Sequence, residues 1–377
     1  YCGYTVNYIS NFTDVDDKII KAANEAGIST KELSDKFIAA FMEDTGQLGI
    51  KPATQNPRVI NYMDEIIAFV STLVDKGFAY VSEGDVYFRV AKSNNYAKLA
   101  NKTLEDLEIG ASGRTDAETE RKENPLDFAL WKAAKEGEVS WDSPWGPGRP
   151  GWHIECSVMA TEILGGTIDI HGGGADLEFP HHTNEIAQSE AKTGKTFANY
   201  WMHNGFVNVD NEKMSKSLGN FVTVHDMLQT VDGQVLRFFL ATQQYRKPIN
   251  FTEKAIHDAE VNLKYLKNTH SLPLTEQVNQ AELQTYLDAF QEAMDDDFNT
   301  ANGVTVLFDM AKWINSGNYD QTVKDAFEKM LQVFGIVFEE EVLDEDIEKL
   351  IEERQAARAN KDFATADRIR DELAAQG

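Results

Sequence analysis

The first part of the chain alternates between strand-like and helix-like hydrophobic patterns. Residues 4–9 are rich in β-branched and aromatic side chains, and Thr13-Asp14-Val15-Asp16 precedes a segment with helical apolar spacing from Ile19 onward. We interpret residues 1–7 as a helix end that passes through Gly3 into a strand. A second helix is predicted to end at Lys76-Gly77, because six apolar residues before it recur at helical spacing: Met63, Ile66, Ile67, Val70, Leu73 and Val74. The opening segment is therefore a predicted βα unit.

Residues 80–90 have the pattern of a β-hairpin. Tyr80-Val81 precedes the turn signal Glu83-Gly84-Asp85, and the apolar residues of Val86–Val90 then alternate with Tyr87 and Arg89. We interpret residues 80–150 as an insertion on the main sheet.

The βα pattern resumes after Gly151 and gives way to helices near Asp232. A short apolar strand at residues 167–170 runs into Gly172-Gly173-Gly174, and residues 205–209 form a predicted hairpin with the turn Asp210-Asn211. The helical half carries two apolar stripes, one of Leu283, Tyr286, Leu287, Phe290 and Met294 and one of Val304, Leu307, Phe308 and Ala311. Residues 347–373 form a charged, amphipathic last segment. We expect the chain to be truncated at both ends.

Composition limits the classes of protein that fit. At 377 residues the chain is long enough for two or three domains, and it has neither a long apolar span nor a leader, so we expect a cytoplasmic protein without a membrane segment. The net charge of −26, from 62 acidic and 36 basic residues, argues against nucleic acid unless a local basic patch exists. Only modest candidates are present, Lys213 with Lys216 and Arg246 with Lys247.

Three side chains of the zinc-ligand type lie close in sequence. They are Cys156, at the end of Gly151-Trp152-His153-Ile154-Glu155-Cys156, and His181 and Glu185, which are four residues apart and share a helix face beyond the helix-starting Pro180. Zinc accepts this mixture of sulfur, nitrogen and oxygen. Taken alone, Cys156 is more often a small buried hydrophobe and His181 with Glu185 an ordinary pair.

A loop with two lysines forms the second chemical signal. Lys213-Met214-Ser215-Lys216-Ser217 follows the predicted hairpin, and its lysines can close over a triphosphate and neutralise charge on a departing pyrophosphate. A basic, solvated turn is the alternative for an isolated match.

Together these segments resemble the cysteinyl-tRNA synthetases, a class I family of aminoacyl-tRNA synthetases. The resemblance runs essentially end to end and in family order, through Asn11 to Lys18, Asn124 to Phe128, residues 141–150, Trp152 to Ser157, His171 to Leu177, Phe179 to Glu185, the lysine loop and Asp232 to Arg237. So many separated motifs do not agree by chance, although each alone is weak.

The resemblance implies an α/β fold with a Rossmann-like parallel-sheet catalytic domain, an insertion, an all-α stem-contact region and a helical bundle. The implied catalytic domain has two parts, residues 1–79 and 151–231, with the insertion between them at residues 80–150. The stem-contact region covers residues 232–272 and the tRNA-binding bundle residues 273–377.

The resemblance also implies the site. Zinc is held by Cys156, His181 and Glu185, with a fourth ligand from a family cysteine upstream of Tyr1, and Cys2 has a structural role instead. The family's histidine-rich phosphate signature is absent from the chain. Trp152 closes the cysteine pocket, which is lined by Thr13, His171 and Asp176. The expected ATP contacts are Gly172, Gly173, Gly174, Lys213, Met214, Ser215, Lys216 and Ser217.

Each pocket residue also has a structural alternative. Thr13 with Asp16 forms a plausible helix-capping pair, Trp152 could belong to the core, and His171 and Asp176 could satisfy loop backbone. The three glycines could form only a turn, although glycines at a carboxyl strand end let a nucleotide approach the backbone. The histidines His153, His182 and His203 receive no role.

The implied reaction is cysteine activation by ATP with Mg²⁺, assisted by Lys213 and Lys216, and transfer to tRNA(Cys) by a monomer. One alternative is the related ligase that joins cysteine to an amino sugar in mycothiol synthesis, against which the long helical half from Leu283 to Leu373 argues. A zinc hydrolase built on His181 and Glu185 also stays open, as does a non-catalytic RNA- or zinc-binding fragment.

Overall fold

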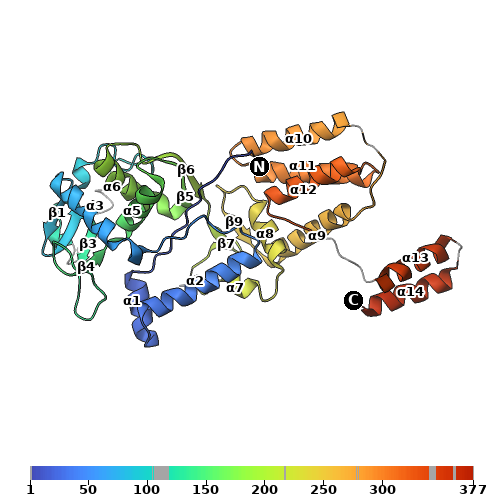
Figure 1. The fold of residues 1–377 in the computed structure, drawn as a ribbon, viewed down its shortest axis with the longest axis horizontal. Coiled ribbons are helices and arrows are strands. Elements are labelled where there is room, and N and C mark those ends of the chain that lie inside the picture. The colour runs from blue at the N-terminus through green and yellow to red at the C-terminus, as the bar shows by residue number, and fades with distance from the viewer. Residues whose placement is uncertain are drawn as a thin grey trace.

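The chain folds into a sheet-containing part and a helical bundle, followed by a separate pair of helices (Figure 1). This computed structural model describes residues 2–103, 105, 119–215, 218–276, 278, 280–338, 345–359 and 362–376. Short 3₁₀ segments occur at Val59–Asn61, Val90–Lys92, Thr119–Arg121 and Ala175–Leu177.

The N-terminal segment differs from its sequence-based prediction. Residues 2–8 form no helix or strand, and parallel bridges pair only Ile9 with Gln55 and Phe12 with Arg58. The predicted regular strand and the preceding helix end are therefore wrong. Alternating apolar residues need a surface to pack on, whereas the side chains expected on this strand are exposed: Tyr4, Val6 and Tyr8. Cys2 is exposed as well.

Helices α1 (Asp17–Ala26) and α2 (Thr30–Gln47) follow this segment. The N-cap of α1 is Asp16, whose carboxylate accepts from the Ile19 N–H at 2.7 Å, so the predicted capping role of Thr13 is wrong. Thr13 remains in the extended segment before the helix.

The region of the expected insertion contains an antiparallel sheet in the order β1-β2-β3-β4. Helix α3 (Met63–Asp75) leads into β1 (Ala79–Ser82) and β2 (Asp85–Phe88), and the predicted helix end and hairpin are both confirmed. Strands β3 (Phe128–Ala133) and β4 (Gly148–Pro150) complete it. The expected alternation along β2 is wrong, because Tyr87 packs on Tyr80 and donates to Asp85 and is therefore buried.

The second half of the α/β part contains the predicted parallel pair. Helix α5 (Trp152–Leu164) precedes β5 (Ile168–Gly174), and helix α6 (Thr183–Thr193) connects β5 to its parallel partner β6 (Ala198–Asn204). The three glycines lie inside β5, opposite Met202, His203 and Asn204, and do not form a turn beyond the strand. The carboxyl ends of both strands therefore lie at one edge.

A small mixed sheet follows β6. The hairpin of β7 (Val207–Val209) and β8 (Glu212–Lys213) is confirmed, with positive φ at Asp210 and Asn211. Helices α7 (Val224–Met227), α8 (Gly233–Ala241) and α9 (Glu253–His270) fill most of the next region. The stretch expected to be helical also contains β9 (Ile249–Phe251), which pairs in parallel with β7.

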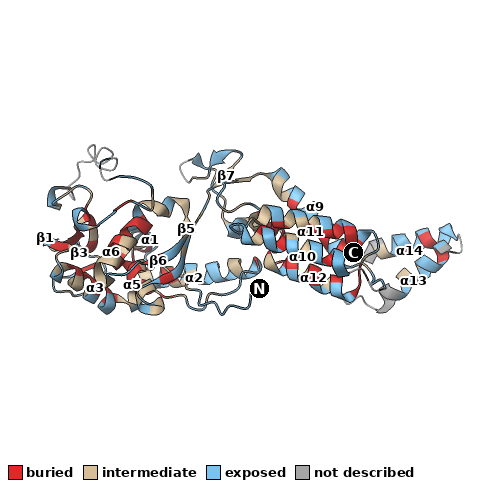
Figure 2. Cartoon of the chain, turned by 90° about the horizontal axis from the view of Figure 1, so that it is seen from above, coloured by how far each residue is buried: buried red, intermediate tan, exposed pale blue. Residues whose placement is uncertain are grey.

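The helical bundle has one extended core. Helices α10 (Gln280–Asp295), α11 (Thr300–Asn315) and α12 (Gln321–Val333) pack with α8 and α9, and the residues of both predicted stripes pack in or against this core. Figure 2 shows the buried residues on the facing sides of these helices. Leu48, just beyond α2, joins the same core and ties the two parts together. Beyond the bundle, α13 (Glu345–Ala359) and α14 (Phe363–Gln376) pack on each other.

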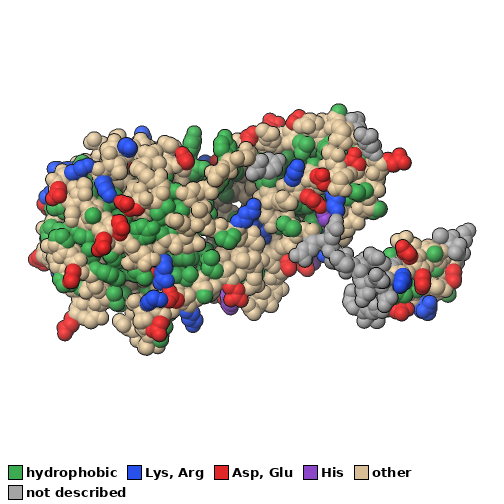
Figure 3. Space-filling model, in the orientation of Figure 1, with side chains coloured by type: hydrophobic (Ala, Val, Ile, Leu, Met, Phe, Trp, Pro, Cys, Tyr) green, Lys and Arg blue, Asp and Glu red, His purple; other side chains and the backbone are tan. Residues whose placement is uncertain are grey.

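The surface carries no extended basic stripe on the face shown in Figure 3, where the described lysines and arginines are scattered among acidic side chains. One expected basic pair is engaged elsewhere, because Arg246 forms an ion pair with Asp297. None of the described helices is long and apolar enough to cross a membrane.

Candidate functional site

Three elements bring the predicted zinc ligands together. Cys156 lies on α5 and Glu185 on α6, while His181 lies in the kinked turn Glu178–His182, with extended backbone at Phe179, that runs into α6. Pro180 therefore lies in this turn and not at the start of α6, which begins at Thr183. The Cys156 sulfur, a ring nitrogen of His181 and a Glu185 oxygen all lie within 4.8 Å of one another. Tetrahedral zinc ligands lie roughly 3.3–3.8 Å apart, so a small contraction suffices.

The surroundings of these ligands fit a cation. Glu185 is fully buried, and Nε2 of His171 lies 3.2 Å from its Oε2 without the geometry of a hydrogen bond. Its Oε1 lies 3.1 Å from Nε2 of His181, whose Nδ1 is 2.9 Å from Nδ1 of His153. If His181 donates its Nδ1 proton to His153, its Nε2 is left with a lone pair directed at the carboxylate. A metal ion between these two acceptors would satisfy both.

The ionisation of the cluster follows from its burial. Burial raises the pKa of the Cys156 thiol well above its usual range, and the Glu185 and Glu155 carboxylates add to this, while a hydrogen bond from Asn11 (3.7 Å) opposes it. Burial would also raise the pKa of Glu185, but His171 and His181 outweigh it and lower that pKa. A thiol that resists ionisation is a poor ligand until a cation replaces its proton.

Trp152 lies at the mouth of this cluster. Its ring centroid is 4.3 Å from that of His181, and the residue is 48% exposed. This exposure excludes a place for Trp152 in the core.

A second histidine group shares Glu185. Ring nitrogens of His171 and His182 also lie within 4.8 Å of the Glu185 carboxylate. Nδ1 of His182 is 2.7 Å from Nε2 of His203, and burial lowers the pKa of His182 to about 3. His171 therefore contacts the carboxylate of Glu185, and the prediction that it satisfies loop backbone is wrong.

The glycines of β5 have unequal surroundings. A Cβ at Gly173 would lie 2.9 Å from both His182 and Leu177, so this glycine allows the histidine group to pack. Gly172 points to the opposite face and is exposed. A Cβ at Gly174 would collide with the Asp176 carboxylate, and Asp176 itself is exposed on the following 3₁₀ turn. Gly172 thus leaves its part of the strand end open to a ligand, whereas the Asp176 carboxylate covers Gly174.

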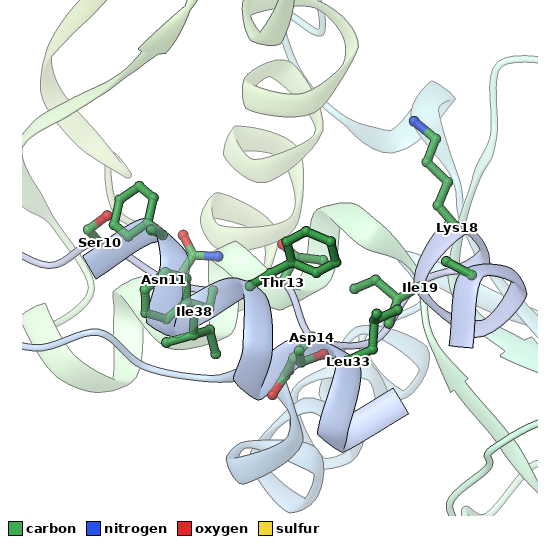
Figure 4. Close-up of a pocket in the computed structure, with 13 residues that line it drawn as sticks. Ser10, Asn11, Thr13, Asp14, Lys18, Ile19, Leu33 and Ile38 are labelled. Carbon is green, nitrogen blue, oxygen red and sulfur yellow. The ribbon is translucent and has the colours of Figure 1, made fainter. Parts of the chain in front are cut away.

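Thr13 borders a separate, largely apolar pocket of about 450 Å³ between the N-terminal segment and helices α1 and α2 (Figure 4). The zinc-type ligands do not line it. Asn11 connects this pocket to the ligand cluster, because it lines the pocket and its side chain donates to the Cys156 sulfur.

The lysine loop begins at the end of β8, in the hairpin that follows β6. Lys213 is exposed and its Nζ lies 4.6 Å from the Phe206 ring centroid. Asn220 closes the loop, because it donates to the Lys213 carbonyl (3.2 Å) and accepts from the Ser215 N–H (2.9 Å). Met214 and Ser215 are half-buried, whereas Lys216 and Ser217 lie outside the described residues.

Sequence reasoning missed several residues that shape the site. Asn11, His153 and Asn220 lie in or next to the recognised motifs and had no assigned role, yet each contacts a predicted site residue. Phe206 was not singled out. For Asn11, His153 and Asn220 the only signal in the sequence was their place near motif residues. The contact of Asn11 with Cys156 spans 145 positions, so no local pattern indicates it.

Comparison with known families identifies the whole chain. Residues 1–261 match the catalytic domain of class I (C) tRNA synthetases, residues 289–339 match the DALR domain and residues 340–377 match the cysteinyl-tRNA ligase anticodon binding domain. The cysteine–tRNA ligase of Streptococcus thermophilus (strain CNRZ 1066) is 95% identical over 377 residues, which are 100% of this chain and 84% of that protein. The Streptococcus agalactiae serotype III (strain NEM316) protein of the same name is 80% identical over the same shares.

Solved structures show the same fold at low sequence identity. Mycobacterium tuberculosis methionyl-tRNA synthetase in complex with methionyl-adenylate has a TM-score of 0.62 at 15% identity, covering 88% of this chain and 81% of that one. A putative arginyl-tRNA synthetase from Campylobacter jejuni has a TM-score of 0.53 at 15% identity, covering 89% and 76%. The fold is thus that of class I synthetases, with a parallel α/β part and a helical C-terminal part, and the expected class of enzyme is confirmed. The chain belongs to the cysteinyl-tRNA synthetase family and is an aminoacyl-tRNA synthetase.

Proposed function

We propose that this enzyme activates L-cysteine with ATP and transfers it to tRNA(Cys), with a zinc ion held by Cys156, His181 and Glu185. The observation that carries the zinc assignment is the convergence of sulfur, nitrogen and oxygen donors at the fully buried Glu185 carboxylate, among the described residues. When bound there, zinc supplies a soft Lewis acid that prefers a cysteine thiolate to a serine hydroxyl.

The other pocket residues orient the amino acid. Trp152 covers the cluster from the solvent side, and His171 extends from β5 beside Glu185. Thr13 lies in the N-terminal segment, and Asp176 lies in the turn after β5. We assign to these two residues contacts with the amino and carboxylate groups. This arrangement directs the substrate carboxylate toward the edge where β5 and β6 end.

ATP is proposed to bind along that edge, with Mg²⁺. Gly172 is exposed and leaves room for the nucleotide to approach the backbone, Gly174 lies next to it under the Asp176 carboxylate, and Gly173 serves the histidine packing. Lys213, Met214 and Ser215, with Lys216 and Ser217, close over the phosphates. The substrate carboxylate attacks the α-phosphorus in line and pyrophosphate leaves, while the two lysines stabilise the developing charge. A terminal ribose hydroxyl of tRNA then attacks the carbonyl carbon of the cysteinyl adenylate, the bond to the phosphate breaks, and AMP leaves.

The acceptor is assigned from the helical half of the chain. Its matches to the DALR and anticodon binding domains favour tRNA over the amino sugar of the mycothiol ligase, because a small acceptor needs no such extension. The negative net charge taken alone argued against an RNA partner, and the domain matches outweigh it.

The proposal is tested by cysteine-dependent ATP–pyrophosphate exchange, with zinc quantified in the same samples. We expect exchange with cysteine and not serine, and loss of both zinc and exchange in Cys156→Ser. Cys2→Ser is the matched control, because Cys2 is exposed and is not among the grouped ligands. Exchange by a zinc-free protein, or equal zinc loss in both variants, would refute the zinc assignment. Transfer of the cysteinyl group to added tRNA(Cys) then tests the acceptor.

A further inference from the structure

The corner between α10 and α11 is tied to the loop that precedes β9. Asp297 receives a forked contact from Arg246, with Nε–Oδ2 at 2.5 Å and Nη2–Oδ1 at 3.2 Å, and its Oδ1 also accepts from the Tyr245 hydroxyl at 2.8 Å. The Thr300 hydroxyl adds a hydrogen bond to the Gln243 carbonyl at 2.8 Å. We call Asp297, Arg246 and Tyr245 the corner clamp.

The backbone of this corner is held in an unfavourable conformation. Asp297 and Phe298 both have φ of 52°, in the left-handed region that residues other than glycine seldom adopt. Such backbone persists where the surroundings hold it, and it often marks function. An exposed ion pair by itself adds little to stability. Arg246 is 55% and Asp297 43% exposed at the side chain, so positioning explains this forked clamp better than stability does.

The clamped loop abuts the backbone at the end of β6. The Tyr245 carbonyl accepts from the Gly205 N–H at 2.7 Å, and a Cβ at Gly205 would lie 2.4 Å from the Lys247 carbonyl group. The Ile249 N–H then donates to the Phe206 carbonyl at 2.8 Å. Backbone therefore packs directly on backbone, and a shift of the loop must move residues 205 and 206.

Those residues support the hairpin that carries the lysine loop. Strand β9 pairs with β7, which pairs with β8. The side chain of Asn250 in β9 accepts from the Asn211 N–H at 2.7 Å, in the hairpin turn. Lys213 lies over Phe206, and the Met214 N–H faces the Val207 carbonyl at 3.4 Å. The base of the lysine loop is thus built on the strand that follows the corner clamp.

We propose that Asp297 is a positioning residue for the lysine loop: through Arg246 and Tyr245 it fixes β9, and thereby couples the position of the helical bundle to that of Lys213. This inference rests on the proposed role of the lysine loop in ATP activation. It assigns to the acidic corner of the bundle a part in catalysis that involves no contact with substrate.

The test compares Asp297→Asn with Asp295→Asn by exchange kinetics. Asparagine tolerates positive φ, and its amide oxygen can still accept from Tyr245. Its NH2 group replaces the oxygen that accepts from Nε of Arg246, so the contact with Arg246 is broken. We expect kcat to fall about threefold to tenfold in Asp297→Asn, with the KM for cysteine and the zinc content unchanged. Asp295→Asn removes the same charge at the end of α10, where its carboxylate contacts Gln291, and should leave kcat unchanged.

Two further readouts separate positioning from a structural effect. Trypsin cleavage after Lys213, followed by mass spectrometry, should be faster in Asp297→Asn than in the wild type, although the two proteins have the same melting temperature. The double variant Arg246→Gln/Asp297→Asn should be no slower than either single variant, because both changes break one contact. Multiplying effects in the double variant, or an unchanged kcat in Arg246→Gln, would overturn the proposal, as would unchanged cleavage. If the wild type shows no cysteine-dependent exchange, the proposed function fails, and the cleavage rates alone decide the clamp.

Discussion

Replacing Asp14 by asparagine tests how the segment that carries Thr13 is held in place. Asp14 is 3% exposed, and its carboxylate accepts from Nε of Arg58 at 2.7 Å and from the Ile60 N–H at 3.2 Å. Arg58 also donates to Asp35 at 2.6 Å on α2. One arginine therefore joins the N-terminal segment, the parallel bridge at residue 58 and α2.

The expected cost follows from which contacts asparagine keeps. Its amide oxygen can still accept from Ile60, but the charge-assisted bond from Arg58 is lost. Hydrogen bonds to charged groups contribute roughly 1.5–3 kcal/mol, so we expect the free energy of unfolding to fall by about 2 kcal/mol. Asp35→Asn is the control, because Asp35 is 42% exposed at the side chain and its loss should cost less.

The assay is urea denaturation of both variants, with the change in free energy taken from the shift in midpoint at constant slope. Because the segment holds Thr13, the cysteine concentration that gives half-maximal exchange should also rise in Asp14→Asn and not in Asp35→Asn. Equal destabilisation by the two variants would refute the reasoning that burial makes the Asp14 contact stronger. Destabilisation without any change in cysteine dependence would show that Thr13 does not depend on this anchor.

Further predictions concern the metal, the histidine packing and pH. Cys156→Ser should weaken zinc binding by at least about tenfold in a chelator competition, whereas Cys2→Ser leaves it unchanged. Gly173→Ala should destabilise the protein by about 1–3 kcal/mol in urea, because its Cβ would meet His182 and Leu177 at 2.9 Å, and Gly172→Ala should cost less because its nearest contact is the Met202 carbonyl at 3.3 Å. The hydrogen bond and charge of Asp44 raise the pKa of His225, so this pair between α2 and α7 stabilises the fold below pH about 6.5 and loses that effect as pH rises through the raised pKa. The urea midpoint of His225→Gln should therefore lie further below that of the wild type at pH 6 than at pH 8.

Controls for these three predictions are direct. Zinc retained by Cys156→Ser would show that the thiol is not a zinc ligand. A Gly173→Ala variant as stable in urea as Gly172→Ala would show that the histidine packing tolerates a methyl group. A His225→Gln difference that grows from pH 6 to pH 8 would reverse the sign expected of a raised pKa.

Local patterns were reliable where an element needs only its own residues. The end of α3 at Lys76-Gly77, the hairpin turn at Asp210-Asn211 and the apolar stripes of α10 and α11 all have the structure their sequences predict. Each depends on backbone preference or on a helix face, and both are properties of short segments.

Predictions failed where the outcome depended on a distant partner. Residues 4–9 have strand-like residues, yet only Ile9 finds a bridging partner, 46 positions later. Tyr87 was expected to alternate outward but is buried, and β9 was hidden in a stretch with helical character. Hydrophobic periodicity reports how much surface a segment offers for burial, and it does not say what covers that surface.

The sequence by itself determined the family, the order of βα and helical parts, and the chemical types of the candidate ligands, because motifs and periodicity are local. Only the tertiary structure decided that Cys156, His181 and Glu185 converge, that Gly173 is needed for histidine packing while Gly172 is open, and that Asp297 reaches the loop before β9. These facts depend on contacts between segments far apart in the chain. Such contacts are set by how helices and strands pack as whole units, and no short stretch of residues encodes that packing.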